Sequence, residues 1–500
     1  MPDAFTKAGY DEHVVAASIR WSQTFQESCT ERFHLVQIVH GNNVLITKPL
    51  QKAVILGLWL LISRQILFLS HKMSEPIRVA ISGGGLAGAT LLFALLPHSH
   101  LEVHVFESAS AFKEAGAAVG VSRNAQAALS LIGQPAMECL QRAGAVPQKG
   151  VQVMMGQGAG QGSMVCLLDA DNDGGSRVTS IVHRAALLRE LLASVPPDHM
   201  HVSKKLENVD RNNDGSLTIH FSDETTHDCD ILIGADGIHS TVRKLVLGEG
   251  GPAAVPRNTG WWAVMALKSY AEAQASIGKG PINIEDAREY GWIGDGTFLM
   301  HNLLSDGQLA QLIVTAYKKE AVGSDQWFRT VSADELRKHY QDWPPHLKKA
   351  VEELLCDEPE RTAMYLWEHP PCHTYVSGPL CIMGDAAHAT TPWQASGGGM
   401  SVEDSFILSS LLGHAKTTME AVNALKAYDE VRRPRTQRIV ESSRGTGEIM
   451  TGRGGETKVP LEQVREKLVH RWDFIWDIEL EKHRDKAITI MDRLNQHSGP

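Results

Sequence analysis

Residues 77–88 read IRVAISGGGLAG, a run of β-branched and small residues that passes directly into glycines spaced as Gly-x-Gly-x-x-Gly. The run predicts a buried parallel strand over residues 77–82, and the apolar stretch after the glycines predicts a helix. A second strand, predicted over residues 101–106, leads into Glu107, about 20 residues beyond the glycine turn. Strand, glycine turn, helix, strand and terminal acid together indicate a βαβ dinucleotide-binding unit.

Each part of this fingerprint has a physical role. Gly83 permits the tight turn, Gly85 lets the backbone approach a pyrophosphate, and Gly88 lets the helix pack closely on the strand. The helix N-terminus offers unpaired N–H groups to the anion, and Glu107 can accept hydrogen bonds from ribose hydroxyls. FAD, NAD and NADP all use such a unit, and the acid at residue 107 disfavours only a 2′-phosphate.

Length and composition bound the remaining possibilities. The chain has 500 residues, enough for about two to three domains. Its formal net charge of −10 offers no basic field to nucleic acid, which we exclude as a partner. The seven cysteines are scattered, and neither Cys-x-x-Cys nor His-Glu-x-x-His spacing occurs. We therefore expect neither a disulfide framework nor a metal site.

Residues 1–72 precede the predicted fold and have no assigned chemistry. The apolar run at residues 53–70 is interrupted by Arg64, so a membrane-spanning helix is a marginal interpretation. It also lies too far along the chain for a simple signal peptide. We interpret residues 1–72 as an extension that is either an anchor or a leader, with Met73 as a candidate initiator. The expected location is cytoplasmic, with membrane association through residues 53–70 as the alternative.

Later segments carry a resemblance to group A flavoprotein monooxygenases. The dual FAD/NAD(P)H motif of that family resembles DILIGADGIHSTVR at residues 230–243, and its Gly-Asp motif resembles CIMGDAAHATTP at residues 381–392. Fungal salicylate-hydroxylase-like enzymes have a stretch similar to PWQASGGGMSVED at residues 392–404, and a His-Arg pair similar to that in VHR at residues 182–184. The motifs stand in the family's order, and the resemblance covers most of residues 73–494.

The resemblance implies an α/β fold with three parts. They are a Rossmann-type FAD-binding domain of the p-hydroxybenzoate hydroxylase type, an interleaved β-sheet substrate domain and a C-terminal helical cap. The boundaries we expect are 1–72 for the extension, 73–255 and 376–446 for the FAD-binding domain, 256–375 mainly for the substrate sheet, and 447–500 for the cap. Helices predicted over residues 461–494 should pack on the FAD-binding domain, and Pro434 should end the helix before them.

The expected cofactor-binding residues combine the fingerprint with the resemblance. In the resemblance, Asp385 of the Gly-Asp motif holds the ribityl chain and Arg184 reaches the flavin. A strand predicted over residues 376–383 would deliver Asp385 to the carboxyl end of the sheet. The glycine run at residues 397–399 precedes a helix predicted over residues 402–412, whose N-terminus would face the flavin. The full set is Gly83, Gly85, Gly88, Glu107, Gly120, Arg184, Asp236, Gly237, Asp385 and Gly398.

Three residues near these motifs have a structural alternative. Glu403 and Asp404 can be acids that favour the first turn of the helix rather than parts of the site. We interpret His388, three residues after Asp385, as a packed and hydrogen-bonded side chain rather than a general base.

The substrate sheet is predicted from strands over residues 260–267, 297–304 and 311–316. Related enzymes often carry an Arg at the end of the first strand and a Tyr on the next. This chain has Met265 and Asn302 at those places. That pair therefore cannot be carried over from the resemblance.

Catalytic residues are consequently not assigned, and His301, Asn302 and His239 are candidates by location only. Trp393 stands where the family often has His, and Ala395 where it often has Gly. Both departures alter the expected roof of the substrate pocket.

The function implied is that of an FAD-dependent monooxygenase, which uses NAD(P)H as co-substrate and O₂ to hydroxylate a phenolic or aromatic-acid small molecule in secondary metabolism. One alternative is an NAD(P)-dependent dehydrogenase, although no Tyr-x-x-x-Lys lies near the predicted active edge. The other is a membrane-tethered FAD-binding protein without turnover, motivated by residues 53–70 and the altered pocket.

Overall fold

The computed structural model describes residues 75–113, 118–168, 178–278, 282–305 and 307–497. The apolar run at residues 53–70 lies outside them, so its interpretation as an anchor stays a prediction. None of the helices in the described ranges is long and apolar enough to cross a bilayer. The same ranges contain no group of His, Cys, Asp or Glu arranged to hold a metal ion.

The predicted βαβ unit lies in a six-stranded sheet of order β19-β20-β12-β1-β2-β8. Its strands are β19 (Val376–Ser377), β20 (Leu380–Ile382), β12 (Ile231–Gly234), β1 (Ile77–Ser82), β2 (Leu101–Phe106) and β8 (Met200–His201). β1 and β2 coincide with the predicted strands and are parallel. The strand predicted over residues 376–383 is instead the hairpin β19–β20, which turns at Gly378 with a φ of +61°.

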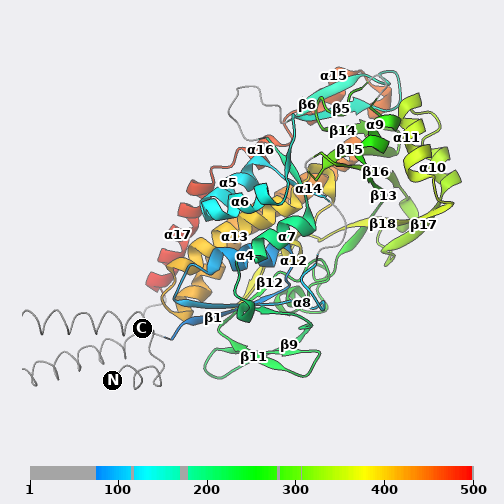
Figure 1. The fold of residues 1–500 in the computed structure, drawn as a ribbon. Helices are drawn as coiled ribbons and strands as arrows, with labels where there is room; N and C mark the ends of the chain where they lie inside the picture. Colours follow the sequence, from blue (N-terminus) through cyan, green and yellow to red (C-terminus); the bar gives the residue numbers. More distant parts are fainter. Residues whose placement is uncertain (1–74, 114–117, 169–177, 279–281, 306, 498–500) are drawn as a thin grey trace, which may run out of the picture. The chain divides into compact units, whose positions relative to one another are not determined.

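Helices α4 (Leu86–Leu95) and α13 (Gly397–His414) form a layer against this sheet and pack on each other (Figure 1). The sheet is covered, so its parallel strands read as continuous apolar runs. Ile81, Val105 and Ile233 are accordingly fully buried. This packing fixes the loops that leave the carboxyl ends of β1, β12 and β20.

A second sheet has eight strands in the order β17-β18-β13-β16-β15-β14-β5-β6. The strands are β17 (Phe328–Ser332), β18 (Glu360–Glu368), β13 (Arg257–Ser269), β16 (Leu309–Tyr317), β15 (Thr297–Leu304), β14 (Glu289–Ile293), β5 (Val151–Met155) and β6 (Met164–Leu168). The three predicted substrate strands are present as β13, β15 and β16. β5 pairs with β14, so residues 151–168 belong to this sheet although the expected boundary lay at residue 255.

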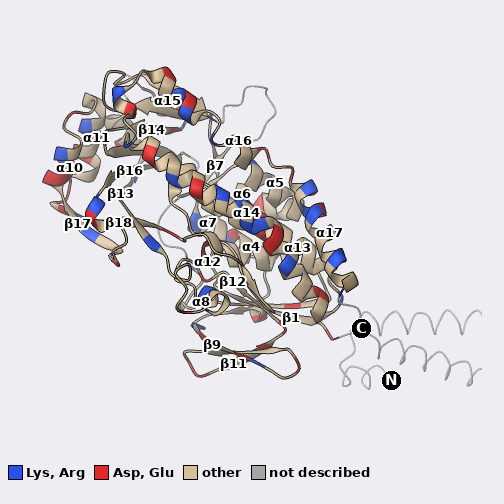
Figure 2. Ribbon diagram, turned by 180° about the vertical axis from the view of Figure 1, so that it is seen from behind, with Lys and Arg blue, Asp and Glu red and all other residues tan. Residues whose placement is uncertain are grey.

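Helix α14 (Thr418–Met450) runs through Pro434, contrary to the prediction that this proline ends it. Pro434 is exposed, so water can bond the carbonyl that the missing proline N–H leaves unpaired. Arg432 and Arg435, on either side of it, both donate to Glu403, so one buried acid holds the helix before and after the proline. The expected boundary at residue 446 therefore falls inside a helix. Figure 2 shows basic and acidic residues along α14.

The predicted helical cap is confirmed. It consists of α15 (Leu461–Leu468), α16 (Asp473–Trp476) and α17 (Leu480–His497), and α17 packs on α13 and α14. The remaining α-helices and β-strands of the described residues are β3 (Ala118–Val121), β4 (Val146–Pro147), β7 (Ser180–His183), β9 (Leu206–Arg211), β10 (Leu217–Phe221), β11 (Thr226–Cys229), α5 (Arg123–Ile132), α6 (Gln134–Arg142), α7 (Arg184–Leu192), α8 (Thr241–Leu247), α9 (Tyr270–Ser276), α10 (Ala333–His339), α11 (Pro345–Leu355) and α12 (Asp385–His388).

Candidate functional site

The turn between β1 and α4 and the first turn of α4 each contain one position that admits only glycine. Gly83 has a φ of +104°, and a Cβ there would lie 2.3 Å from the carbonyl oxygen of Ala235. A Cβ on Gly88 would lie 2.0 Å from the carbonyl oxygen of Gly83. α4 begins after Gly85, which provides no side-chain cap. The N-terminus of α4 carries the positive end of the helix dipole, which favours an anion at this turn.

Glu107 holds this turn from the end of β2. Its Oε2 accepts a hydrogen bond from Gly84 N at 2.8 Å, and its Oε1 accepts one from Ala109 N at 2.7 Å. The carboxylate is partly exposed. Oε1 also accepts from Ser108 Oγ at 3.2 Å, so the second lone pair of Oε2 is the one that stays open. Glu107 can therefore receive a ribose hydroxyl while it stabilises the glycine turn.

Asp385 begins α12 directly after the tight turn at Gly384. Gly384 has a φ of +56°, and a Cβ there would lie 2.8 Å from Ala87 Cβ. The Asp385 side chain is exposed and accepts no hydrogen bond from the described residues. Its Oδ1 lies 3.9 Å from the place of a Cβ on Gly397, the first residue of α13. A carboxylate that has no partner in the described part of the chain thus stands beside a helix N-terminus.

The start of α13 is lined by glycines that bring β3 close to it. A Cβ on Gly398 would lie 2.7 Å from Val119 Cγ2, and a Cβ on Gly120 would lie 3.3 Å from Ala395 Cβ. Ala395 itself has a left-handed backbone with a φ of +49°, a conformation that costs alanine more than glycine. Gly398 and Gly120 therefore allow β3 and the start of α13 to approach closely, and the glycines place no side chains of their own over the N-terminus of α13. We call this glycine-lined surface the cradle.

Asp404 supports the Gly384–Asp385 turn from within the protein. Its Oδ2 accepts from Gly384 N at 3.0 Å and lies 2.6 Å from His388 Nε2, while its Oδ1 accepts from Arg432 Nε at 2.8 Å. Burial would raise the pKa of Asp404, but His388 and Arg432 outweigh it and lower that pKa. His388 is therefore a packed hydrogen-bonded residue, as the sequence suggested.

Glu403 completes the same buried network. It accepts from Arg432 Nη1 at 2.6 Å, Arg435 Nε at 2.8 Å and Asn124 Nδ2 at 2.6 Å. Burial opposes ionisation of Glu403, yet Arg435 and Arg432 hold its pKa well below the usual range. Glu403 and Asp404 thus have structural roles, which are carried by buried ion pairs rather than by solvated acids at the first turn.

Asp236 and Gly237 lie in the loop between β12 and α8. Asp236 Oδ2 accepts from Thr241 N at 2.8 Å and Val242 N at 3.1 Å, and its Oδ1 accepts from Ser240 Oγ. Burial raises the pKa of Asp236. Its contacts within the described residues therefore cap α8, and the predicted contact with the cofactor stays a prediction.

Arg243 lies close to the candidate site, and the sequence did not lead us to predict a role for it. It is fully buried, and its guanidinium donates to Ala253 O at 2.8 Å, Ala386 O at 2.9 Å and Ala387 O at 2.7 Å. It thereby joins α8 to α12 immediately behind Asp385. The one sequence feature that could have indicated its role is its place at the end of the motif at residues 230–243. Residue spacing in the sequence does not show that an arginine is buried.

Arg184 begins α7 directly after β7, and it is half-buried. β7 pairs with β3, so Arg184 directly follows a strand of the small sheet that contains Gly120. Of these two predicted residues, Gly120 is the one that lies close to the start of α13, beside Ala395. The predicted flavin contact of Arg184 stays a prediction.

One side of the eight-stranded sheet, here called the η4 face, packs against Trp393 of the single turn η4 (Pro392–Gln394). The Trp393 ring lies edge-on to the rings of Trp261 at 5.6 Å and Phe298 at 5.4 Å between centroids. Strand pairing sets four rungs of side chains on this face. The rungs are Trp261–Tyr317, Ala263–Thr315–Phe298, Met265–Ile313–Met300 and Leu267–Gln311–Asn302.

The η4 face is apolar in its middle and carries two amides at its far end. Met265, Ile313 and Met300 are half-buried. Gln311 Oε1 accepts from Ala118 N at 3.3 Å, which ties this end of the face to β3. Asn302 is 3% exposed, and its Oδ1 is buried without a hydrogen-bond partner among the described residues. An unpaired buried amide is costly unless something else satisfies it.

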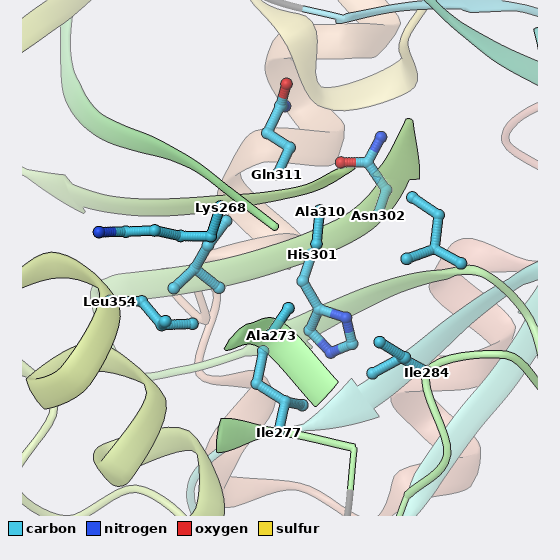
Figure 3. A pocket seen from close by; sticks show the side chains of 11 residues that line it. Lys268, Ala273, Ile277, Ile284, His301, Asn302, Ala310, Gln311 and Leu354 are labelled. Carbon is cyan, nitrogen blue, oxygen red and sulfur yellow. The ribbon is translucent and has the colours of Figure 1, made fainter. Parts of the chain in front are cut away.

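His301 lies on the opposite, helix-covered side of the sheet from Asn302. Figure 3 shows its ring directed toward Ile277 and Ile284, whereas the Asn302 and Gln311 side chains extend the other way. Trp292 Nε1 donates to His301 Nε2 at 3.4 Å, and burial lowers the pKa of His301 to about 3. The structure therefore separates two candidates that are adjacent in sequence.

His239, the third candidate, lies beside the β18 end of the sheet. Its exposed ring is 4.2 Å from the ring of Trp327, which stacks on Trp367 at 4.0 Å. Among the described residues, His239 therefore makes no ring contact with those that form the four rungs of the η4 face.

Comparison with known proteins agrees with this geometry. Residues 77–443 match the family described as FAD binding domain. The chain is 33% identical to 6-methylsalicylate 1-monooxygenase of Aspergillus terreus, over 83% of this chain and 93% of that protein. It is 30% identical to a salicylate hydroxylase of Pseudomonas putida, over 81% and 92%. A solved salicylate hydroxylase substrate complex superimposes with a TM-score of 0.72 at 25% identity, covering 83% of this chain and 98% of that chain.

Proposed function

The chain belongs to the family of FAD-binding monooxygenases that includes the salicylate hydroxylases, and on this premise we propose that it uses NAD(P)H and O₂ to hydroxylate a phenolic or aromatic-acid small molecule. One atom of O₂ enters an aromatic C–H bond, and the other leaves as water while NAD(P)H is oxidised. FAD, when bound, supplies the electron and oxygen transfer.

The observation that carries the proposal is Asp385. Its exposed carboxylate, without a partner in the described residues, stands at the carboxyl end of β20 beside the N-terminus of α13. We assign Asp385 to the ribityl hydroxyls of FAD, Glu107 to a ribose and the start of α4 to the phosphates. The positive end of α13 would then stabilise negative charge on the flavin ring.

The chain's own contribution to the reaction is to orient a ring and exclude water. Trp393, Trp261 and Phe298 form an aromatic end on the η4 face, and Met265 with Ile313 continues an apolar floor. An aromatic substrate lying on this floor would be held between the sheet and the cradle at α13. The proposal needs no protein nucleophile, and orientation in a dry site is the main protein effect.

Three measurements on the purified protein test the proposal. The protein should carry bound flavin, oxidise NAD(P)H faster when a suitable phenol is added, and yield a product heavier by one oxygen atom.

The variant Asp385→Asn should lose flavin, whereas Asp325→Asn, at an exposed site distant in sequence, should retain it. Flavin-free protein with an intact fold would overturn the proposal.

The alternatives give different results in the same assay. A dehydrogenase would consume or form NAD(P)H without O₂. A membrane-tethered FAD-binding protein without turnover would be yellow but would not oxidise NAD(P)H above background, and its proposed tether lies outside the described residues.

A further inference from the structure

Four histidines gather at the edge of the six-stranded sheet, where β8 pairs with β2. His104 lies on β2, His201 on β8 and His227 on β11, and His199 ends the single turn η2 (Pro197–His199) just before β8. The ring centroid of His104 lies 5.2 or 5.3 Å from those of the other three. All four residues are half-buried. We call them the histidine cluster.

One contact within the cluster requires an uncharged ring. His104 Nδ1 lies 3.0 Å from His201 Nε2, so one of these nitrogens donates a hydrogen and the other accepts it. If both rings were protonated, both nitrogens would carry hydrogens, and two cations would repel each other in place of the bond. Burial and then the neighbouring His104 lower the pKa of His201, and the same two causes lower the pKa of His227. The folded cluster therefore resists full protonation.

The charged groups around the cluster do not compensate for several protons. Those that act on its rings come from each element packed against it, and they are Glu102, Asp198, Lys204 and Asp228. Glu102 Oε1 lies 3.5 Å from His104 Nε2, but the Glu102 side chain is 48% exposed, and an exposed pair of this kind is weak. Lys204 adds a positive charge at the same edge, although Asp223 pairs with it at 2.5 Å. A first proton can be held beside Glu102, whereas further protons meet like charges.

The cluster lies beside the backbone that carries Glu107. The ring of Phe106, which is on the same face of β2 as His104, stacks on the His201 ring at 4.8 Å between centroids. The next residue, Glu107, donates from its N to His201 O at 2.8 Å, and its O accepts from Lys204 N at 2.8 Å. β8 has two residues and is the outer strand of its sheet. A strand with so few backbone bonds depends on its side-chain contacts to stay attached.

We infer that the histidine cluster makes the retention of FAD sensitive to pH. When the rings take up protons in mild acid, β8 separates from β2, and Glu107 loses the support that lets it hold the glycine turn through Gly84 N. This inference rests on the proposed function, which assigns Glu107 to a ribose of FAD.

The direction of the effect follows from the number of protons that each state binds. Rings in the open state take up protons at the ordinary histidine pKa of about 6.5, before rings in the closed cluster do. The closed state, which binds FAD, is therefore favoured above about pH 6.5 and is lost as the pH falls below that value.

The test measures the affinity of the full-length, cofactor-free protein for FAD at about pH 7.5 and about pH 5.5. The unaltered protein should bind FAD at least about tenfold more weakly at the lower pH, which is the effect of a shift of one pKa unit. His201→Gln should remove most of this difference, because glutamine can still donate to His104 Nδ1 but takes up no proton. His104→Phe, which keeps a ring at the centre of the cluster, should do the same.

His220→Gln is the matched control. His220 lies on β10, on the face opposite to His227, and its Nε2 lies 2.9 Å from Asp210 Oδ2. The variant removes a histidine from the same small sheet without changing the cluster, so it should keep the full pH dependence.

Hydrogen exchange follows β8 independently of FAD. After correction for the intrinsic effect of pH on exchange, the amides of residues 200–204 should exchange faster in acid in the cofactor-free, unaltered protein. In His201→Gln this acceleration should be absent.

The possible outcomes separate this inference from the proposed function. Equal FAD affinity at the two pH values would overturn the inference, and so would an undiminished difference in both His201→Gln and His104→Phe. Protein that binds no FAD at either pH would count against the proposed function itself. Hydrogen exchange would still test the cluster in that case, because exchange at residues 200–204 that does not respond to acid would overturn the inference.

Discussion

The imidazole Nε2 of His388 lies 2.6 Å from Asp404 Oδ2, and both side chains are fully buried. The same carboxylate oxygen accepts from Gly384 N, the residue before Asp385. A charged network inside the protein thereby positions an exposed carboxylate on its surface. Changes at Asp404 and Asp385 should for that reason have different effects.

Asp404→Asn should destabilise the protein by about 3 kcal/mol, because it leaves the buried Arg432 with one fewer counter-charge. Chemical denaturation of the cofactor-free protein measures this change. An unfolding free energy within about 0.5 kcal/mol of that of the unaltered protein would show that the ion pair between Asp404 and Arg432 does not stabilise the fold.

Asp385→Asn should weaken FAD binding more than tenfold and change the stability of the cofactor-free protein by less than about 0.5 kcal/mol. The reason is that Asp385 is exposed and accepts no hydrogen bond from the described residues. Titration of the cofactor-free protein with FAD gives the affinity. Loss of stability together with affinity would indicate that the residue is structural.

Arg243→Lys should destabilise the protein by about 2 to 3 kcal/mol, because a lysine cannot reach Ala253 O, Ala386 O and Ala387 O at once. FAD affinity should fall as well, since α12 carries Asp385. Thermal unfolding and FAD titration measure both effects. Full retention of both would contradict the role we give to Arg243 behind the cofactor.

Acid should destabilise the protein partly through His301. Burial lowers the pKa of His301 to about 3, whereas an unfolded histidine has a pKa of about 6.5. Between about pH 6.5 and about pH 3, His301 is therefore protonated in the unfolded protein but neutral in the folded protein. The folded state is most favoured above this window, and the contribution of His301 to the unfolding free energy is lost as the pH falls through it. His301→Gln, which can still accept from Trp292, should reduce this slope by up to about 1.4 kcal/mol per pH unit. An unchanged slope would show that His301 is not buried and neutral.

Trp393→Ala should separate NAD(P)H oxidation from hydroxylation. Without the ring that contacts Trp261 and Phe298, water would reach the η4 face. The variant should release more hydrogen peroxide per NAD(P)H than Trp393→Phe, which keeps an aromatic ring. Equal hydroxylation yields from the two variants would contradict the shielding role.

Local patterns predicted the nucleotide-binding part well. β1 and β2 coincide with the expected strands because a covered parallel sheet requires continuous apolar runs, and Gly83 and Gly88 are glycines for steric reasons that spacing reveals. The prediction that Pro434 ends a helix was wrong. A proline on the exposed surface of a helix is tolerated here because buried ion pairs hold the helix on both sides of it.

Long-range partners account for what the sequence could not show. The pairing of β5 with β14, the burial of Arg243 and the network at Glu403 depend on which surfaces meet after folding. His301 and Asn302 could not both face one site, since successive residues of a strand point to opposite sides. The alternation of side chains along a strand could have predicted that His301 and Asn302 lie on opposite sides. It could not have predicted that Asn302 is the residue on the same side as Trp393.

The most direct test of the central claim follows oxygen-18 gas into product with the FAD-loaded protein, NAD(P)H and a phenolic compound that perturbs the flavin spectrum. The account predicts one labelled oxygen atom in the ring for each NAD(P)H consumed, with little hydrogen peroxide. NAD(P)H oxidation that yields only hydrogen peroxide with every phenol and every aromatic acid, or product without label, would contradict it.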